Sequence, residues 1–323
     1  MQNCKCRMGI TLIYKKYGGL FLVLVFTQVL ILFLIIGIGV ITRRLKITTD
    51  AVNKGISELI LGVTLPFLII ISFQMDFSSA LILNAGVVFV VSLFIHILAI
   101  FLGKFIFRVK QESKKKVLKF SIVFSNSAFM GFPVMDSLFG NIGVFYASIF
   151  IILFNIFIWT YGVMLFSDNS QKIQAKNVLI NPGTVSVFIG LILFSFSIKL
   201  PQALHSTLSM VGNTTTPLAM IVVGSRLADA KISEVFTDIY IYFMAFIRLI
   251  FLPILVYFLL SLFPIDPIVM KVCVLSTAMP VAANTTIFAE KYAVDPGFAS
   301  KCVFVSTMLS LLTIPLIHTF ITL

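Results

Sequence analysis

SNSAFMGFPVM, residues 125–135, places two serines, an asparagine, a glycine and a proline inside an otherwise apolar segment. A second apolar segment contains STAMPVAANTTIF, residues 276–288, in which Pro280 precedes another asparagine and two threonines. Proline removes a backbone N–H and clashes with the preceding turn, so we predict that both segments are interrupted helices. The expected interruptions lie at Gly131 and Pro133 in the first segment and at Pro280 in the second.

The composition around these two stretches is that of a membrane protein. Of the 323 residues, 59% are hydrophobic and 11% are charged, and the mean hydropathy is +1.11. A soluble domain carries roughly 25% charged residues. These values exclude a water-soluble globular enzyme, a disordered protein and a nucleic-acid-binding module, whatever the net charge of +12. The four cysteines show neither zinc spacing nor a disulfide framework, and we expect no metal and no cofactor.

Ten apolar stretches approach or exceed the roughly 20 residues that a transmembrane helix needs. They lack the alternation of a β-barrel, so the predicted fold is an all-α membrane protein with ten transmembrane helices. The predicted stretches are Leu20–Ile41, Leu59–Phe73, Leu81–Phe107, Val117–Phe139, Val144–Phe166, Thr184–Ile198, Leu204–Leu227, Ile239–Phe263, Val269–Lys291 and Phe298–Ile321.

Lys and Arg residues are distributed unequally between the two sides of this arrangement. Seventeen fall in or beside the loops after odd-numbered stretches and six on the other side, and Arg248 completes the 24. Because cytoplasmic loops carry the excess of Lys and Arg, we predict a cell-membrane protein with both termini extracytoplasmic. The basic tail with Lys5, Arg7, Lys15 and Lys16 runs against this bias. An alternative start at Met8 and a miscounted span are the two explanations that stay open.

The two halves of the chain resemble each other. SELILGVTLPFLIII around Pro66 matches LSMVGNTTTPLAMIV around Pro217, and the stretch around Pro133 matches the one around Pro280. Five helices per half would turn the second half upside down in the membrane, as in inverted-repeat transporters; chance similarity between apolar helices is the alternative. We therefore predict a tail (1–19), a first five-helix repeat (20–166), a short cytoplasmic loop (167–183) and a second, inverted five-helix repeat (184–323).

The interrupted fourth and ninth helices are predicted to cross near the middle of the bilayer. Irregular backbone is tolerated at that depth only where it is buried in protein or lines a wet cavity. Half-helix N-termini would direct N–H groups and positive dipole ends at one place, which favours an anion. The alternative is that these residues only kink the helices and hold them together. The predicted substrate-binding residues are Asn126, Ser127, Gly131, Pro133, Pro280, Asn284, Thr285 and Arg248.

Arg248 lies inside the eighth apolar stretch. An ionisable residue within the membrane is by default a functional candidate. Three interpretations stay open: contact with a substrate carboxylate, a pair with Glu290, or a side chain that extends to the cytoplasmic face.

Several segments carry motifs. Asn126–Pro133 has the form Asn-x-x-x-x-Gly-x-Pro, Gly212–Pro217 the form Gly-Asn-x-x-x-Pro, and Arg248–Pro253 an Arg-to-Pro spacing. These motifs resemble those of the auxin efflux carrier family, within the bile/arsenite/riboflavin transporter superfamily. Ala278–Tyr292, followed by Asp295-Pro296, is similar to bacterial members, including malonate-transporter-like proteins.

The resemblance implies ten spans, inverted repeats and an elevator-like movement of a crossover domain against a scaffold. It also implies transport of organic anions and, by similarity to plant auxin carriers, contact of Asn126 with a substrate carboxylate. Ser167–Asn181 leaves no room for the large cytoplasmic loop of the plant carriers, so a small carboxylate is favoured over auxin.

The predicted function is secondary active transport of small organic anions, with the substrate and the lipid bilayer as partners and no nucleic acid. Export of an auxin-like aromatic acid and passive conduction by an anion channel are the alternatives. A membrane-embedded enzyme would need paired intramembrane Asp residues, a His-Glu-x-x-His helix or a Ser/His pair, and the sequence shows none of these, so we expect no enzyme. The coupling ion and assembly as a homodimer stay open.

Overall fold

A computed structural model of the protein describes residues 27, 30–76, 78–107, 109–166, 182–228 and 238–322. Within these residues all regular structure is helical. No strand is present among them, and one isolated β-bridge joins two residues. The all-α class is therefore confirmed. The predicted tail 1–19, the start at Met8 and most of the predicted loop 167–183 lie outside the described residues.

Helical residues 30–44 come first among the longer described elements. The helices that follow, with η for a π-helical turn, are α2 (Asp50–Leu59), η1 (Ile60–Thr64), α3 (Leu65–Ser72), α4 (Ser79–Ile106), α5 (Glu112–Val123), η2 (Ser127–Gly131), α6 (Phe132–Phe157), η3 (Ile158–Gly162), α7 (Val163–Phe166), α9 (Pro182–Ser195), α10 (Gln202–Gly212), α11 (Thr215–Ala228), α13 (Ile239–Phe246), η4 (Ile247–Phe251), α14 (Leu252–Ser261), α15 (Pro267–Ala278), α16 (Asn284–Lys291) and α17 (Pro296–Phe320).

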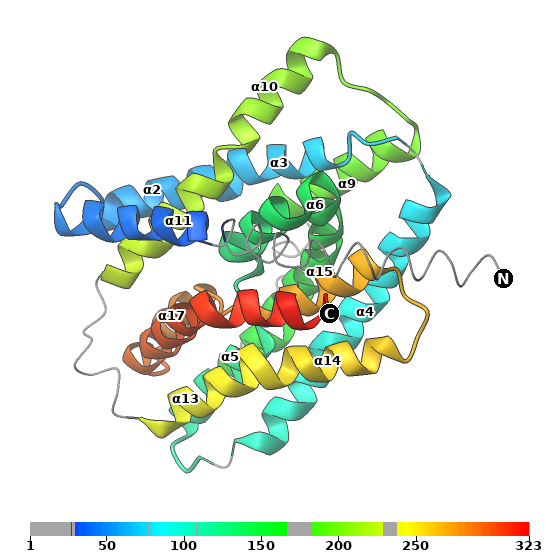
Figure 1. The fold of residues 1–323 in the computed structure, drawn as a ribbon. Helices are drawn as coiled ribbons and strands as arrows, with labels where there is room; N and C mark the ends of the chain where they lie inside the picture. Colours follow the sequence, from blue (N-terminus) through cyan, green and yellow to red (C-terminus); the bar gives the residue numbers. More distant parts are fainter. Residues whose placement is uncertain are drawn as a thin grey trace.

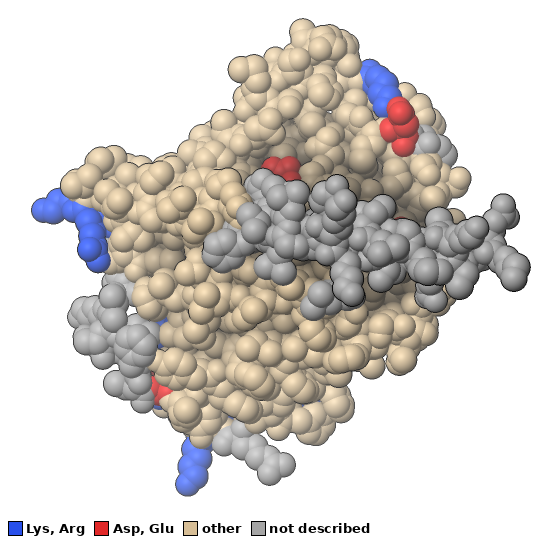
Figure 2. Space-filling view, in the orientation of Figure 1, with Lys and Arg blue, Asp and Glu red and all other residues tan. Residues whose placement is uncertain are grey.

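Several of these helices have the length and composition of membrane spans. Leu83 on α4 is 70% exposed and Leu316 on α17 is 65% exposed, as expected of faces that meet lipid rather than water. On the face shown in Figure 2, the described Lys and Arg side chains lie at the edges. Five helical segments are long and apolar enough to cross a membrane, namely Asp50–Ser72, Ser79–Ile106, Ser127–Phe166, Ile239–Ser261 and Pro296–Phe320. Such a set indicates a multi-pass membrane protein.

The helices form two groups, and one lies above the other in the view of Figure 1. The upper group contains residues 30–44, α2, α3, α9, α10 and α11, with α3 packed on α9 and α10, and α11 on α2. The lower group contains α4, α5, α13, α14, α15, α16 and α17, with α4 packed on α5, α14 on α15, and α17 on α13 and α16. α6 contacts both groups, through α3 and α9 on one side and α4 and α15 on the other.

The interruption in the fourth predicted stretch lies earlier than predicted. α5 ends at Val123, and helical structure resumes at Ser127 in the π-helical turn η2. Gly131 and Pro133 stand where this turn continues into α6, so the prediction that they interrupt the helix was wrong. The wider π-helical turn makes room for the proline ring, which in an α-helix would clash with the carbonyl four residues before it.

A change of direction follows at Gly140, inside α6. Its φ of 58° and ψ of −148° are non-helical, and a positive φ favours glycine because any Cβ would be strained there. Gly140 lies between the fourth and fifth predicted stretches, and the chain bends there as their separation in the sequence predicts.

Residues 30–44 and α11 approach each other closely at two glycines. A Cβ atom on Gly224 would overlap the carbonyl oxygen of Ile36, and one on Gly39 would overlap that of Ile221. Small residues at a helix contact let two backbones come together, which is a common basis of packing between membrane helices.

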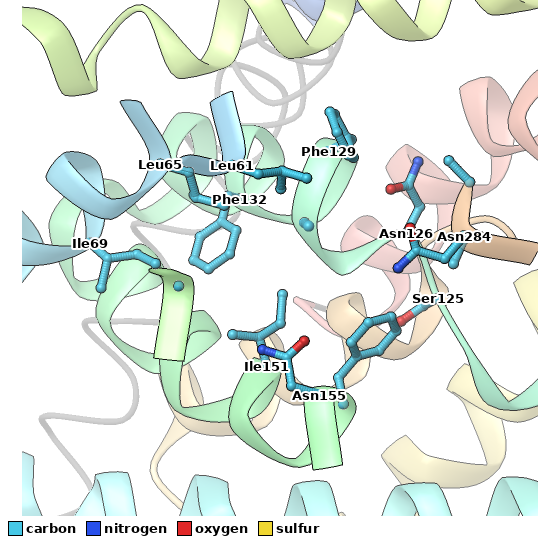
Figure 3. A pocket seen from close by; sticks show the side chains of 15 residues that line it. Leu61, Leu65, Ile69, Ser125, Asn126, Phe129, Phe132, Ile151, Asn155 and Asn284 are labelled. Carbon is cyan, nitrogen blue, oxygen red and sulfur yellow. The ribbon is translucent and has the colours of Figure 1, made fainter. Parts of the chain in front are cut away.

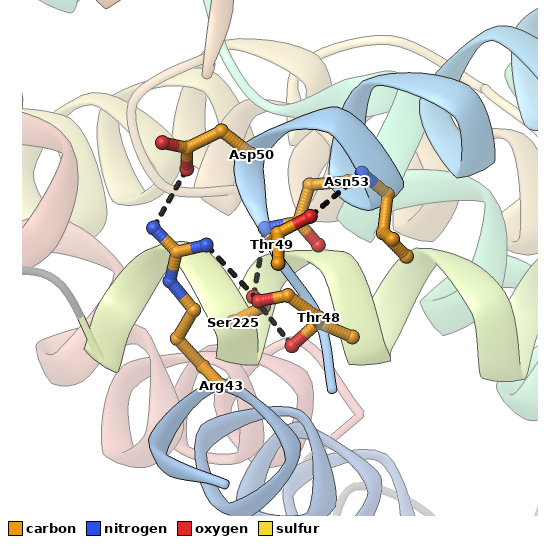
Figure 4. A network of polar contacts seen from close by, with 7 residues as sticks. Arg43, Thr48, Thr49, Asp50, Asn53 and Ser225 are labelled. Carbon is orange, nitrogen blue, oxygen red and sulfur yellow. Dashed lines mark hydrogen bonds and ion pairs between the residues drawn. The ribbon is translucent and has the colours of Figure 1, made fainter. Parts of the chain in front are cut away.

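A polar network holds the start of α2 against the end of α11 (Figure 4). Asn53 Nδ2 donates to Ser225 Oγ at 2.7 Å, and Ser225 Oγ donates to Thr48 Oγ1 at 3.0 Å. Arg43 donates to the carbonyl of Thr48 at 3.0 Å and to the carboxylate of Asp50 at 2.6 Å. Together with the glycine contact, these bonds make the upper group one packed unit.

Gly224→Ala should destabilise the protein by about 1–3 kcal/mol, because the new methyl group meets backbone rather than a movable side chain. Gly37→Ala is the matched control on the facing helix, since a Cβ there meets nothing within 4 Å. Thermal unfolding of the purified variants in detergent measures both. If Gly224→Ala melts together with Gly37→Ala, the close contact between the two helices does not exist.

Candidate functional site

Two interrupted helices meet at their interruptions. The backbone is extended after the end of α5 and after the end of α15, and the two extended segments pair in antiparallel fashion through Ser125 and Val281. The N–H of Asn126 donates to the carbonyl of Pro280 at 2.7 Å, and the N–H of Ala282 donates to the carbonyl of Phe124 at 3.0 Å. Each interruption therefore satisfies backbone groups of the other, and we call this pairing the crossing.

The crossing places helix ends of opposite polarity around one point. α5 and α15 reach it with their C-termini, where carbonyl groups are left without helical partners. η2, which leads into α6, and α16 leave it with their N-termini, where N–H groups point outward. Aligned peptide dipoles make the first pair of ends negative and the second pair positive.

Arg248 lies at the negative ends. It comes from η4 and its side chain is buried, with 2% of the residue exposed. Nη1 donates to the carbonyl of Ile122 at 2.6 Å, near the end of α5, and Nε donates to the carbonyl of Met279 at 3.2 Å, just after α15. The guanidinium thus joins the two C-termini. Its burial contradicts the interpretation in which the side chain extends to the cytoplasmic face.

Asn126 lies at the positive ends. It holds the N-cap position of η2, and its carbonyl accepts from the N–H groups of Met130 at 3.2 Å and Gly131 at 2.9 Å. An asparagine at this position ordinarily caps the helix with its side chain. Here the side chain makes no capping bond, and its carboxamide has no hydrogen-bond partner among the described residues although the residue is only 5% exposed.

A central cavity of about 100 Å³ lies beside the crossing (Figure 3). Asn126 and Asn284 form one wall with the hydroxyl of Ser125, and Asn155 reaches the cavity from α6. Asn155 Nδ2 also donates to Thr184 Oγ1 at 3.3 Å. The remaining lining residues are apolar or backbone: Leu61, Leu65, Ile69, Ala128, Phe129, Phe132, Ile151, Phe154, Gly183, Ala282 and Ala283.

A side cavity of about 260 Å³ lies between α11, α16 and α17 and reaches the same asparagine. It shares Asn126 and Ala283 with the central cavity, so the crossing separates two hollow spaces. The other lining residues are Val223, Arg226, Leu227, Thr286, Ser300, Val303, Phe304 and Thr307.

The structure brings together most of the residues that the sequence proposed, in different settings. Ser127 is buried, and its hydroxyl lies 2.6 Å from that of Ser125. Pro280 supplies a carbonyl to the crossing, whereas Thr285 is fully buried with a hydroxyl that has no partner in the described part of the chain. Neither Thr285 nor Arg248 lines the central or the side cavity. The side chain of Glu290 lies outside the described residues.

Asn155 and Arg226 were missing from the predicted site. Asn155 is a single carboxamide in an apolar stretch, so a search for isolated amides in such stretches would have found it. Arg226 was counted only as one of the basic residues that set orientation in the membrane.

Arg248→Ala should destabilise the protein by about 1–3 kcal/mol for each of the two carbonyls that it leaves unpaired. Arg248→Lys keeps the charge but not the planar fork, so it should rescue only part of the loss. Thermal unfolding and the monodisperse fraction after purification measure this, with the exposed Arg44→Ala as control. An Arg248→Ala protein that melts normally but has lost anion binding would return Arg248 to the substrate-binding residues.

Comparisons with known proteins identify relatives that are named as transporters. A family model described as membrane transport protein matches residues 24–318. The chain is 27% identical over 300 residues to an uncharacterized transporter of Methanocaldococcus jannaschii, covering 89% of this chain and 96% of that protein. It is 25% identical over 194 residues to an uncharacterized transporter of Methanothermobacter thermautotrophicus, covering 59% of this chain and 63% of that protein.

A further relative carries a substrate in its name. A Rhizobium meliloti protein named "Putative malonate transporter" is 27% identical over 141 residues, which is 43% of each chain. Family membership and these names favour a transporter over a membrane-embedded enzyme. Because the family model spans nearly the whole chain, the resemblance noted in its motifs is confirmed, and the chain belongs to the membrane transport protein family that includes the auxin efflux carriers.

Proposed function

We propose that the protein is a secondary active carrier of small organic anions and binds a substrate carboxylate at the crossing. Asn126 is the main support. Its carboxamide makes no hydrogen bond within the described part of the chain, and the residue lines both the central and the side cavity. A carboxylate that accepts from Nδ2 would form a charge-assisted hydrogen bond, which is about twice as strong as one between neutral groups.

The charge around Asn126 favours an anion over a cation. None of the described residues that line the central or the side cavity is acidic. The N-terminal ends of η2 and α16 add positive potential without a formal charge. Malonate, in the name of the Rhizobium meliloti relative, is a small carboxylate and fits this chemistry.

We propose ten spans in two inverted five-helix repeats. Thr64 and Thr215 support this arrangement, because they stand two residues before Pro66 and Pro217 in the two matching motifs and bond to each other at 2.9 Å. The crossing supports it as well, since Ser125 from one interruption pairs with Val281 from the other. If the two halves are related by a two-fold axis, residues at matching positions can contact each other on that axis. In the proposed repeat, the interruption after α5 therefore corresponds to the interruption after α15, whereas the sequence comparison had matched Pro133 with Pro280.

Elevator-type alternating access would move the lower group, which carries the crossing, against the upper group. In the upper group, α3, α9 and α11 contact α6. The close glycine contact and the polar network, by contrast, lie wholly inside the upper group. The upper group then acts as the scaffold. The central and the side cavity would give Asn126 access from opposite sides of the crossing as the carrier changes state.

Counterflow in proteoliposomes tests the proposed function. Vesicles loaded with unlabelled dicarboxylate or aromatic acid should accumulate the labelled compound transiently, because a carrier exchanges substrate across the membrane. An anion channel would give flux without counterflow, and an exporter of aromatic acids would respond only to the aromatic members of the panel.

Asn126→Ala should weaken substrate binding by roughly 10- to 150-fold, the loss of a hydrogen bond to a charged group at ~1.5–3 kcal/mol. Asn126→Asp should be worse, because it sets a negative charge against the substrate. Asn141→Ala, an exposed asparagine that lines neither cavity, is the control and should bind normally. Calorimetry on monodisperse protein gives the affinities. Wild-type affinity in a folded Asn126→Ala variant would remove Asn126 from the site.

The proposed orientation places both termini outside the cytoplasm. Single cysteines introduced at Gln111 and at Leu323, in a chain whose four native cysteines are replaced, should react with a membrane-impermeant maleimide from opposite sides of the membrane. Labelling of both positions from one side would refute ten spans with extracytoplasmic termini.

A further inference from the structure

Three lysines lie together where α4 ends and α5 begins, near the bottom of Figure 1. Lys104 is in the last turn of α4, and Lys115 and Lys119 are neighbours one turn apart on α5. Lys119 is close enough to both of the others for their positive charges to repel its own. We call these three residues the lysine cluster. Because like charges at short range destabilise each other, the cluster favours a negatively charged partner.

The packing of α4 on α5 brings the lysine cluster together. A Cβ atom on Gly103 would lie 3.7 Å from the Cα atom of Lys119, so the two backbones come close at this point. Lys104 follows Gly103 in the chain, and its positive charge is therefore placed near that of Lys119. The position of the cluster is thus set by a contact between helices and not only by the flexible ends of its side chains.

The surrounding protein supplies little negative charge to the lysine cluster. Glu112 is the acidic residue whose charge reaches Lys119, and its carboxylate accepts a hydrogen bond from Lys115 Nζ at 2.9 Å. Lys116 adds another positive charge near Glu112. Among the described residues, neither Lys104 nor Lys119 has an ion pair or a side-chain hydrogen bond. Positive charge is therefore in excess here.

An apolar stripe leads away from the lysine cluster along the outside of α4. It consists of Ile97, Phe101 and Phe105, which are spaced four residues apart on one face of the helix and are all exposed. The ring centres of Phe101 and Phe105 are 4.6 Å apart. Lys104 Nζ lies 5.8 Å from the centre of the Phe105 ring, so a positive charge stands at the end of the stripe. An exposed apolar face on a membrane span is in contact with acyl chains.

We propose that Lys104 and Lys119 bind the phosphate of an anionic phospholipid whose acyl chain lies along the apolar stripe. A phospholipid joins a negative phosphate to an apolar chain, and the lysine cluster and the stripe present complementary groups in the same order. A free phosphate would use the lysines alone. The excess of positive charge favours a headgroup that carries no cation of its own, as expected for basic residues beside a membrane span.

The inference goes beyond the proposed function and does not depend on a substrate at the crossing. It nevertheless connects the bilayer to the crossing, because α5 begins at the lysine cluster and ends at Val123, just before the first interruption. A bound lipid would hold the end of the helix that leads to that interruption.

Competition between two phospholipids tests the site. Purified wild-type protein is mixed with phosphatidylglycerol and phosphatidylcholine that have identical acyl chains, and native mass spectrometry counts the molecules of each that stay bound. The wild-type protein should prefer phosphatidylglycerol. Lys119→Gln should lower this preference by roughly 5-fold, the share of one basic residue near an anionic surface. The double variant Lys104→Gln/Lys119→Gln should lose most of it, whereas Lys104→Arg/Lys119→Arg, which keeps both charges, should retain it.

Arg44→Gln/Lys54→Gln is the matched control, because it removes two exposed positive charges from the same proposed side of the membrane but from the upper group. It should keep the lipid preference, and melting temperatures in detergent show that each variant is folded. Three results would overturn the site: equal binding of the two lipids by wild-type protein, an unchanged preference in Lys104→Gln/Lys119→Gln, or an equal loss in the control. Displacement of phosphatidylglycerol by millimolar inorganic phosphate would also overturn it, since the lysine cluster would then bind a free anion.

Discussion

Two backbone hydrogen bonds, from Asn126 to Pro280 and from Ala282 to Phe124, are the constraint on which the other features of the site depend. A helix that opens inside a bilayer leaves N–H and C=O groups without water to satisfy them, at several kcal/mol for each group. Two openings at the same place satisfy each other. The crossing therefore requires both interruptions, and neither would be stable without its partner.

The crossing also separates the negative and the positive ends of the helix dipoles. Carbonyl ends gather on one side, where the buried Arg248 binds two of them, and N–H ends gather on the other, where Asn126 keeps an unused carboxamide. One side of the crossing is thus satisfied within the protein, and the other is where we propose that the ligand binds. Because the positive potential near Asn126 comes from dipoles and an amide, an anion can be bound there and released again without the protein having buried a permanent charge for it.

The sequence predicted the helices better than it predicted the interruptions. A long apolar stretch indicates a segment that lies in lipid or in the protein interior, and it can be recognised from consecutive residues alone. The all-helical class was predicted from such stretches. Pro280 was correctly placed at an interruption because proline acts on its own helix. The other interruption, at Phe124–Asn126, contains neither proline nor glycine, since it is fixed by pairing with a segment far away in the chain. Gly131 and Pro133 were the nearest local signals and were therefore mistaken for its cause.

The same distinction applies to the candidate site. Asn126 and Asn284 were found because polar residues stand out in apolar stretches, and both line the central cavity. The partners of Arg248 are backbone carbonyls at the ends of two other helices, and a backbone carbonyl cannot be recognised as a partner from the residue type in the sequence. Arg226 could not be separated from the other basic residues near helix ends until the fold brought it into a cavity with Asn126.

Solid-state NMR can measure the proposed contact directly, through the dipolar coupling between a ¹³C-labelled substrate carboxylate and the ¹⁵Nδ2 of Asn126. The best dicarboxylate from the counterflow panel should show a coupling that corresponds to about 4 Å, the separation expected when Nδ2 donates to a carboxylate oxygen. The signal should be assigned by its loss in Asn126→Ala protein saturated with the same ligand. A saturated wild-type sample without this coupling would contradict a carboxylate site at the crossing.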